Sequence, residues 1–596
     1  MRELFRDATA GKILRLLSGD KFLKYPEEQD AFADSEKGNP DTWRRYLNVQ
    51  KTQNVRHHGT CEDPEEEQSS EEDKEVDNAD QHRDQRQGSR PSNTTLGSDR
   101  TRVANEDTVR TDNGGKDVQI IDWDQTEGAL DSENPQNWST GKKFFVTFLI
   151  CLLTFSVYIG SAIYSAGITD VMQQFGVSQV AATAGLTLFV AGYGLGPMIW
   201  SPMSEIPQVG RNPVYIGTLV VFVVFQFGVI YAKNFAMMLI FRFLTGFFGS
   251  PVLATGGASL ADMYAPKKRA YAIGIWGMAA VSGPVLGPLV GGFAAESKGW
   301  TWTIWELTWL SGFALIVLFL LLPETSSANI LYRRRRRLEK SSGVNNLKSE
   351  PELEADEMTT KDKINMALIL PFSLTFSEPI LFCLNLYIAL IYGLLYVWFE
   401  SFAIVFVEIH GFSLGMEGLA FLGIFVGSLV VIPPFFLYLY KFQEPKFDES
   451  GNIKPEIRLQ PAFVGAFCIP ICLFWFGWTS SESIHIQTNA TQWIVPIIGS
   501  AFFSIGAFLL FNSVLNYIGD AYPKVAASAF AGNDFMRSCF GAGFPLFANA
   551  MFKNLGVPWA SSTLAFISVA FIPIPFILYR WGEKIRMKSK RARHDI

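Results

Sequence analysis

Histidine and cysteine are scarce in this sequence, with 6 of each among 596 residues. All of the histidines lie outside the long apolar stretches, so neither a histidine-based catalytic triad nor a zinc site is expected. Only Cys61 lies in a polar region and the other cysteines lie within apolar stretches, which indicates no disulfide framework. The sequence also lacks a glycine-rich loop ending in Gly-Lys-Ser or Gly-Lys-Thr, which argues against an ATP-driven pump. We therefore expect no cofactor, no metal and no enzymatic activity.

Charged residues are also few, at 18%, whereas hydrophobic residues make up 48% of the chain and include 50 Phe. This composition fits a membrane protein better than a set of soluble domains. Residues 26–140 hold long acidic runs, and we predict that they form a disordered cytoplasmic tail. Residues 1–25 lack the continuous apolar core of a secretory signal. Their interleaved basic and apolar residues predict a basic amphipathic helix on the cytoplasmic membrane face, with a disordered segment as the alternative.

Long apolar stretches dominate the chain after Phe144. A helix of about 20 apolar residues crosses a hydrocarbon core of about 30 Å, and twelve stretches reach that length. They lie near 144–166, 181–201, 214–232, 236–257, 271–293, 303–322, 378–405, 416–439, 461–479, 492–517, 526–550 and 559–580. We predict an all-α membrane protein with twelve transmembrane helices in two six-helix halves, at 144–322 and 377–580, joined by a cytoplasmic linker at 323–376.

Lysine and arginine orient these helices. Basic residues gather in alternate loops, including the run Arg333–Arg337, and in a basic tail at 581–596. The positive-inside rule places these regions, and with them both termini, in the cytoplasm. The arginine run is then most simply a determinant of topology, with lipid headgroup or partner binding as the alternative. The sequon at Asn489 falls in a short outside loop, where it is a candidate for glycosylation.

A few charged residues lie inside the apolar stretches, where each is expensive and so a functional hypothesis. Arg242 has apolar neighbours on both sides in the fourth stretch; the alternative is snorkelling toward the outer interface. Glu400 follows an aromatic run in the seventh stretch, where desolvation suits a carboxyl that binds and releases a proton; the alternative is an interfacial acid. Asp534 and Arg537 lie three residues apart, so they share a helix face and are expected to pair.

Glycine and proline mark one side of the fifth stretch. The residues are Gly277, Gly283, Pro284, Gly287, Pro288, Gly291 and Gly292. Small residues let helices approach closely, and prolines remove backbone donors and bend a helix. We predict a hinge or seal between the two halves, with ordinary tight packing as the alternative.

Charged residues also recur in the predicted cytoplasmic loops of the first half. Glu205 and Arg211 flank the loop between the second and third stretches, and Asp262 follows the fourth. We predict that these groups form charge pairs between the halves, which hold one conformation and break in another. The alternative is that each is a solvated loop charge.

At these residues the chain resembles the major facilitator superfamily, and more closely its fungal twelve-span drug:proton antiporters, the group that contains azole and benomyl resistance pumps. The loop from Glu205 is similar to the superfamily signature between the second and third spans, but it has four residues before Gly210 and carries Asn212 where a second basic residue is usual. Arg242 with Gly246 matches the fourth-span motif, whose arginine is associated with proton coupling. The glycine and proline face matches the fifth-span motif of antiporters rather than importers.

Further matches strengthen the resemblance to this subgroup. They are Asp131–Trp138, Ala254–Gly257, Pro323–Thr325, Phe530–Asp534 and Phe544–Phe547. The resemblance implies proton-coupled export of small amphipathic compounds, azole-type antifungals among them, by alternating access. We expect a monomer in the plasma membrane, with the vacuolar membrane as the alternative, whose partners are drug-like molecules, protons and lipid, without nucleic acid.

We assign the proton-coupling role to Arg242 and Glu400. The predicted substrate cavity is lined by Tyr193, Gln226, Tyr387, Tyr396, Asn512 and Asn516, with packing as the alternative role of the aromatic residues. Three other functions stay open: a dedicated exporter of a fungal secondary metabolite or toxin, a nutrient importer, and a membrane sensor that transports nothing. The glycine and proline face argues against the importer, and only the long tail favours the sensor.

Overall fold

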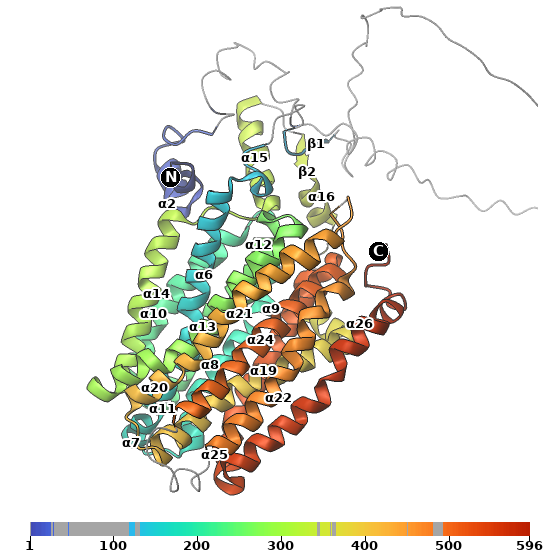
Figure 1. Ribbon diagram of the computed structural model, residues 1–596. Coiled ribbons are helices and arrows are strands. Elements are labelled where there is room, and N and C mark those ends of the chain that lie inside the picture. The colour runs from blue at the N-terminus through green and yellow to red at the C-terminus, as the bar shows by residue number, and fades with distance from the viewer. Residues whose placement is uncertain are drawn as a thin grey trace, which may run out of the picture.

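Long helices run along one common axis and make up nearly all of the part of the chain that the structure describes (Figure 1). The computed structural model describes residues 2–25, 28, 46, 118–124, 131–342, 346–357, 359, 365–449, 451–480 and 493–595. Most of the predicted acidic tail and the sequon at Asn489 lie outside these residues. The helical bundle confirms the all-α fold class predicted from the apolar stretches.

Several helices of the first half begin directly after a polar side chain that caps their first turn. The side chains of Ser139, Ser178 and Asn234 each accept a hydrogen bond from a backbone N–H of the first turn that follows. The helices are α6 (Thr140–Ala162), α7 (Ile168–Phe175), α8 (Gln179–Leu195), α9 (Pro197–Glu205), α10 (Arg211–Ile230), α11 (Phe235–Gly249), α12 (Pro251–Met263), α13 (Pro266–Lys298) and α14 (Thr301–Leu321). Helix α13 is continuous through Pro284 and Pro288.

The second half is less regular, because π-helical and 3-10 turns interrupt its helices. Its elements are η4 (Asn365–Ile369), α18 (Leu370–Ser377), α19 (Pro379–Phe402), η5 (Ala403–Ile409), α20 (Leu414–Ala420), α21 (Leu422–Tyr438), η6 (Leu439–Gln443), η7 (Glu444–Lys446), η8 (Pro455–Leu459), α22 (Gln460–Thr479), α24 (Ile494–Ala521), η9 (Pro523–Val525), α25 (Ala526–Phe571) and α26 (Pro573–Arg586). Within α25, Gly556 has a φ of 75°, a left-handed conformation that glycine adopts without steric cost. The chain turns back there, so α25 holds two membrane helices.

The number of membrane helices agrees with the sequence prediction. Eleven helical stretches among the described residues are long and apolar enough to cross a membrane. The last of them, Ser528–Arg586, contains the turn at Gly556 and covers both the eleventh and twelfth predicted spans. The described residues therefore contain twelve helices long and apolar enough to cross a membrane, six in each half.

The outer surface of the bundle is strongly apolar. Large side chains such as Phe313, Trp559 and Phe566 are 58%, 60% and 60% exposed. A surface of this kind is unfavourable in water and is typical of a protein that faces lipid hydrocarbon.

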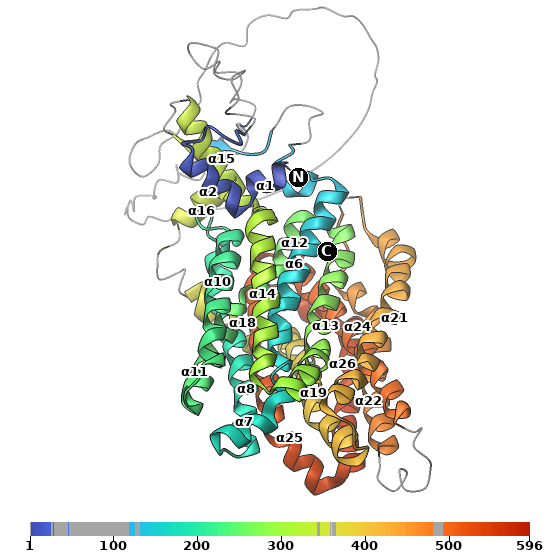
Figure 2. The ribbon, with the colours of Figure 1, turned by 90° about the vertical axis from the view of Figure 1, so that its left-hand side faces the viewer.

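A small polar cap covers one end of the first half and lies at the same end as both chain termini (Figures 1 and 2). It consists of α1 (Arg2–Asp7), α2 (Thr9–Leu17), α15 (Ser327–Ser342), α16 (Glu350–Glu357) and a parallel pair of strands, β1 (Gln119–Ile121) and β2 (Leu347–Ser349). The Thr9 hydroxyl donates to Asn212 over 2.6 Å, which holds α2 against the bundle. Leu16 and Leu17 stay 80% and 79% exposed.

Ion pairs hold the cap together. The Arg334 guanidinium donates to both carboxylate oxygens of Asp131 over 2.5 and 2.9 Å, and Arg337 pairs with Glu133 at 2.9 Å. Burial opposes the ionisation of Asp131, but Arg334 holds the pKa of that carboxyl below its ordinary value. The run Arg333–Arg337, predicted to act on topology or lipid, thus also makes intramolecular contacts that the sequence did not predict.

Candidate functional site

A cavity of about 570 Å³ lies between the two halves and reaches the end of the bundle that carries the cap. At its mouth it is lined by residues of the first half such as Glu205 and Asp262, and by Asp520 of the second half. Deeper in the bundle it is lined by Trp276, Asn516, Asp534 and Arg537. A smaller space of about 40 Å³ shares Trp276 and Arg537 with it. The protein is therefore open between its halves at one end.

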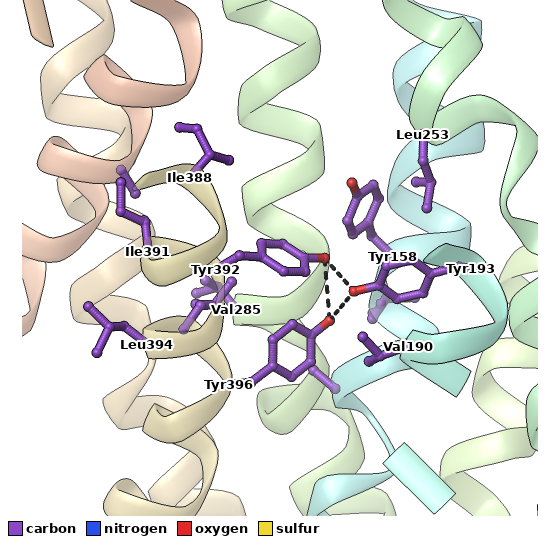
Figure 3. Packing of buried hydrophobic residues seen from close by; sticks show 14 of the residues in the cluster. Tyr158, Val190, Tyr193, Leu253, Val285, Ile388, Ile391, Tyr392, Leu394 and Tyr396 are labelled. Carbon is purple, nitrogen blue, oxygen red and sulfur yellow. Dashed lines mark hydrogen bonds between the residues drawn. The ribbon is translucent and has the colours of Figure 1, made fainter. Parts of the chain in front are cut away.

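Three tyrosine hydroxyls join the halves, and Figure 3 shows them pointing toward one another. Tyr193 of α8 lies 2.5 Å from the hydroxyl of Tyr392 and 2.9 Å from that of Tyr396, both on α19. Beside them, Arg537 of α25 donates to the hydroxyl of Tyr158 on α6 over 2.9 Å. These contacts form a layer between the cavity and the far end of the bundle.

Glu400 joins the halves beyond this layer. Its carboxylate accepts hydrogen bonds from Gln179 at 3.2 Å and Thr183 at 3.5 Å, both on α8, and from Asn549 of α25 at 3.4 Å. The side chain is only 6% exposed. The carboxyl predicted to carry protons is therefore buried at a contact between halves, and the donors that hold it are neutral.

A second acid, Glu417 on α20, is also buried, and it lies close enough to Glu400 for the two carboxyls to interact electrostatically. Glu417 is not among the residues singled out from the sequence. The available signal was its place one residue inside the eighth apolar stretch.

The glycine face of α13 serves two different contacts. A methyl group at Gly283 would lie 2.7 Å from Tyr158 of α6, and one at Gly287 would lie 2.8 Å from Ile163 directly after α6, which is packing within the first half. Gly291 also faces Ile163, whereas a methyl group at Gly292 would overlap the carbonyl oxygen of Leu414 on α20. Helices α13 and α20 therefore touch closely at the closed end, where Glu296 also accepts a hydrogen bond from the backbone N–H of Gly415 at 3.0 Å. Gly277 is different, because a methyl group there would lie no closer than 3.5 Å to its nearest neighbour outside the helix, the Asn512 amide nitrogen.

Arg242 is fully buried within the first half and points into the bundle. It donates to the carbonyl oxygens of Gly185 on α8 at 3.0 Å and Gly160 on α6 at 3.1 Å. Its guanidinium lies over the rings of Tyr164 and Phe189, 4.7 and 4.5 Å from the ring centres. Among the described residues no carboxylate forms an ion pair with it. Arg242 and Glu400 are thus not in contact, but both bind the same stretch of α8.

The predicted loop charges come together within one half. Arg211 forms an ion pair with Asp262 at 2.6 Å, and Glu205 lines the same cavity mouth. All three belong to the first half, so in this conformation the pair does not bridge the halves as we predicted. Among the described residues, a charge pair that does bridge the halves is Lys268 with Glu444, at 2.7 Å.

The predicted cavity residues fall into three groups. Asn512 lines the smaller space and Asn516 the larger one. Tyr193 and Tyr396 belong to the hydroxyl layer. Gln226 is buried on α10, and Tyr387 packs against Phe571 with ring centres 5.5 Å apart; neither lines the two cavities. Their polarity suggested a cavity role, but their helix faces point elsewhere.

Other proteins share this sequence pattern and fold. The sequence model of the Major Facilitator Superfamily matches residues 150–545. Transporter mfs1 of Schizosaccharomyces pombe is 44% identical over 79% of this chain and 88% of that protein. Fluconazole resistance protein 1 of Saccharomyces cerevisiae is 38% identical over 82% of this chain and 88% of that protein. The solved structure of the proton:xylose symporter XylE is similar in fold, with a TM-score of 0.51, 17% identity and coverage of 74% and 96%.

Two six-helix halves that enclose a cavity, and matches that extend over most of the chain, lead to one conclusion. The chain belongs to the major facilitator superfamily and is a membrane transporter, not an enzyme.

Proposed function

We propose that this transporter exports small amphipathic compounds, azole-type antifungals among them, in exchange for protons. The name of the relative from Saccharomyces cerevisiae, a fluconazole resistance protein, supports the drug class. The cavity supports the transport route, because it lies between the halves and is open at one end only in the described part of the chain. The export direction follows from the glycine face of α13, which matches the antiporter motif.

The open end faces the cytoplasm in this proposal, and the protein acts as a monomer in the plasma membrane. Both chain ends, the basic loops and the cap lie at this end, as the positive-inside rule requires of a cytoplasmic side. The exposed Leu16 and Leu17 of α2 then contact the lipid surface beside the cap. The acidic region before α6 would be a cytoplasmic tail.

Glu400 carries the mechanism. A carboxylate buried without a cation is unfavourable, and three neutral donors at 3.2 to 3.5 Å offset that only in part. The outer gate, which we define as the contacts of Glu400 with Gln179, Thr183 and Asn549, therefore closes more readily on the protonated acid. Loss of the proton to the cytoplasm leaves a charge that favours hydration and hence outward opening. In the open state Glu400 takes up an outside proton and the gate closes again.

Arg242 supports the same cycle by positioning α8. Its two hydrogen bonds to backbone carbonyls connect α8 to α6 and α11, so a shift of α8 on outer opening also moves α6 and α11 of the first half. A dedicated exporter of one metabolite would use the same gate. Competition among chemically unrelated compounds separates the two readings, since only a multidrug exporter is inhibited by many of them.

The purified protein in liposomes tests the proposal. The lumen is made acidic, the membrane potential is clamped and rhodamine 6G is added to the bath. Transporters whose cytoplasmic end faces the bath should then carry the dye into the liposomes as protons leave. Collapse of the pH gradient by nigericin should abolish this uptake. Undiminished accumulation after collapse would rule out proton exchange.

A further inference from the structure

The deep part of the cavity contains two hydrogen-bond acceptors without partners among the described residues. They are Oδ1 of Asn512 and Oδ2 of Asp534. Both side chains are 2% exposed, and both line the connected spaces around Trp276 and Arg537. The Trp276 indole N–H beside them is engaged, because it donates to Thr154 at 2.8 Å.

The neighbouring contacts fix both atoms as acceptors. The Asn512 amide nitrogen donates to the carbonyl oxygen of Phe508 at 2.9 Å, so the amide oxygen must point the other way. In Asp534 the first carboxylate oxygen accepts two bonds from Arg537, from Nε at 2.8 Å and from Nη2, which leaves the second oxygen over. A buried acceptor has to be satisfied by something, and in a hydrated cavity that is water.

A bound substrate that displaces this water must replace its hydrogen bonds. Each acceptor left unsatisfied weakens binding by about 5- to 150-fold. The pair of Asp534 and Arg537 is neutral overall, so this region does not select for charge. Aromatic residues complete the site, since Phe511 and Tyr392 lie 5.7 and 5.3 Å from the Arg537 guanidinium.

We propose that Asn512 and Asp534 form an acceptor pair that recognises substrates through N–H or O–H donors attached to a flat apolar body. The inference deepens the proposed function by naming the chemical class that the cavity takes. A site of this kind distinguishes two compounds of equal size, charge and hydrophobicity by their hydrogen-bond donors alone.

Two dyes provide the comparison. Rhodamine 6G carries two secondary amine N–H groups, whereas tetramethylrhodamine ethyl ester has the same cationic ring system without N–H. In fluorescence polarisation with the full chain in nanodiscs, the wild-type Kd for rhodamine 6G should be at least fivefold lower. Asn512→Leu should remove most of this preference, because rhodamine 6G loses the acceptor for one N–H group and the other dye no longer leaves that acceptor unsatisfied. Asp534→Asn replaces the free acceptor with an amide that can donate. It should lower the ratio of the Kd for tetramethylrhodamine ethyl ester to the Kd for rhodamine 6G, even where the lost charge changes the Kd values of both dyes.

Asn385→Leu is the matched control. Asn385 is a buried amide of the same half, but its oxygen accepts from Asn533 at 2.9 Å and it lies outside both cavities. Its substitution should leave the ratio unchanged. Equal wild-type affinity for the two dyes, no binding of either, or a parallel loss of both in Asn512→Leu would overturn the acceptor pair. Failure of pH-driven uptake despite a normal Kd ratio would instead count against the proposed function alone.

Discussion

Glu400→Gln tests the gate most directly, because it keeps the shape of the side chain and removes its charge. The ionised acid accepts three hydrogen bonds in the closed gate. A bond to a charged group contributes about 1.5–3 kcal/mol and a neutral one about 0.5–1.5 kcal/mol, so glutamine loses roughly 3–5 kcal/mol here. It also avoids the several kcal/mol needed to bury an unpaired charge. In the proposed mechanism the second effect is the larger one, so the gate should close on glutamine as it does on the protonated acid, and the dependence of closure on protons should disappear.

Two transport modes separate these effects. Net uptake driven by a pH gradient requires a change in protonation at Glu400 and should fall at least 100-fold in Glu400→Gln liposomes. Exchange of labelled for unlabelled substrate requires only opening and closing, and it should stay within about tenfold of wild type, or about 1.4 kcal/mol.

The control is Glu408→Gln, which removes an acid on η5 about two helical turns beyond Glu400. The side chain of Glu408 is 55% exposed and lies 3.7 Å from Lys553. Such a surface pair contributes little, so both transport modes should survive. Full gradient-driven uptake by Glu400→Gln, or its equal loss in Glu408→Gln, would refute the assignment of the proton to Glu400.

Three further predictions concern other parts of the protein. Gly292→Val should prevent outer closure and trap the halves apart, whereas Gly277→Ala, with space for a methyl group, should close normally. Double electron–electron resonance across the outer gate measures the separation of the halves in both variants. Normal closure of Gly292→Val would contradict the predicted seal. Arg242→Lys cannot keep two bonds in a fork, so uptake should fall about tenfold or more at unchanged expression, and wild-type uptake would exclude the positioning role. Burial, together with Arg333, lowers the pKa of Lys12 to about 7, whereas an undocked lysine holds its proton to about pH 10.4. Docking of α2 then releases a proton above pH 7, so docking becomes more favourable as pH rises. Hydrogen exchange in Thr9–Leu17, corrected for intrinsic rates, should slow from pH 7 to 8.5 in wild type but not in Lys12→Met.

Much of the site was visible in the sequence as isolated residues. Arg242 and Glu400 stood out because charges are rare in apolar stretches, and the spacing of Asp534 and Arg537 predicted the pair that the structure contains. Glu417 was missed because an acid near a helix end looks interfacial until the neighbouring helix buries it. The contact of Lys268 with Glu444 joins residues far apart in the chain, and no local pattern announces such a partner.

The sequence by itself determined the twelve membrane helices and their grouping into two halves. Hydropathy sums over about 20 consecutive residues, so the solvent that each segment prefers is a local property of the chain. Only the tertiary structure decided which polar atoms face the cavity, which glycines meet the opposite half, and that Glu400 lies against α8. These contacts depend on helix rotation and on which helices are neighbours, and both are set by packing among segments that are hundreds of residues apart.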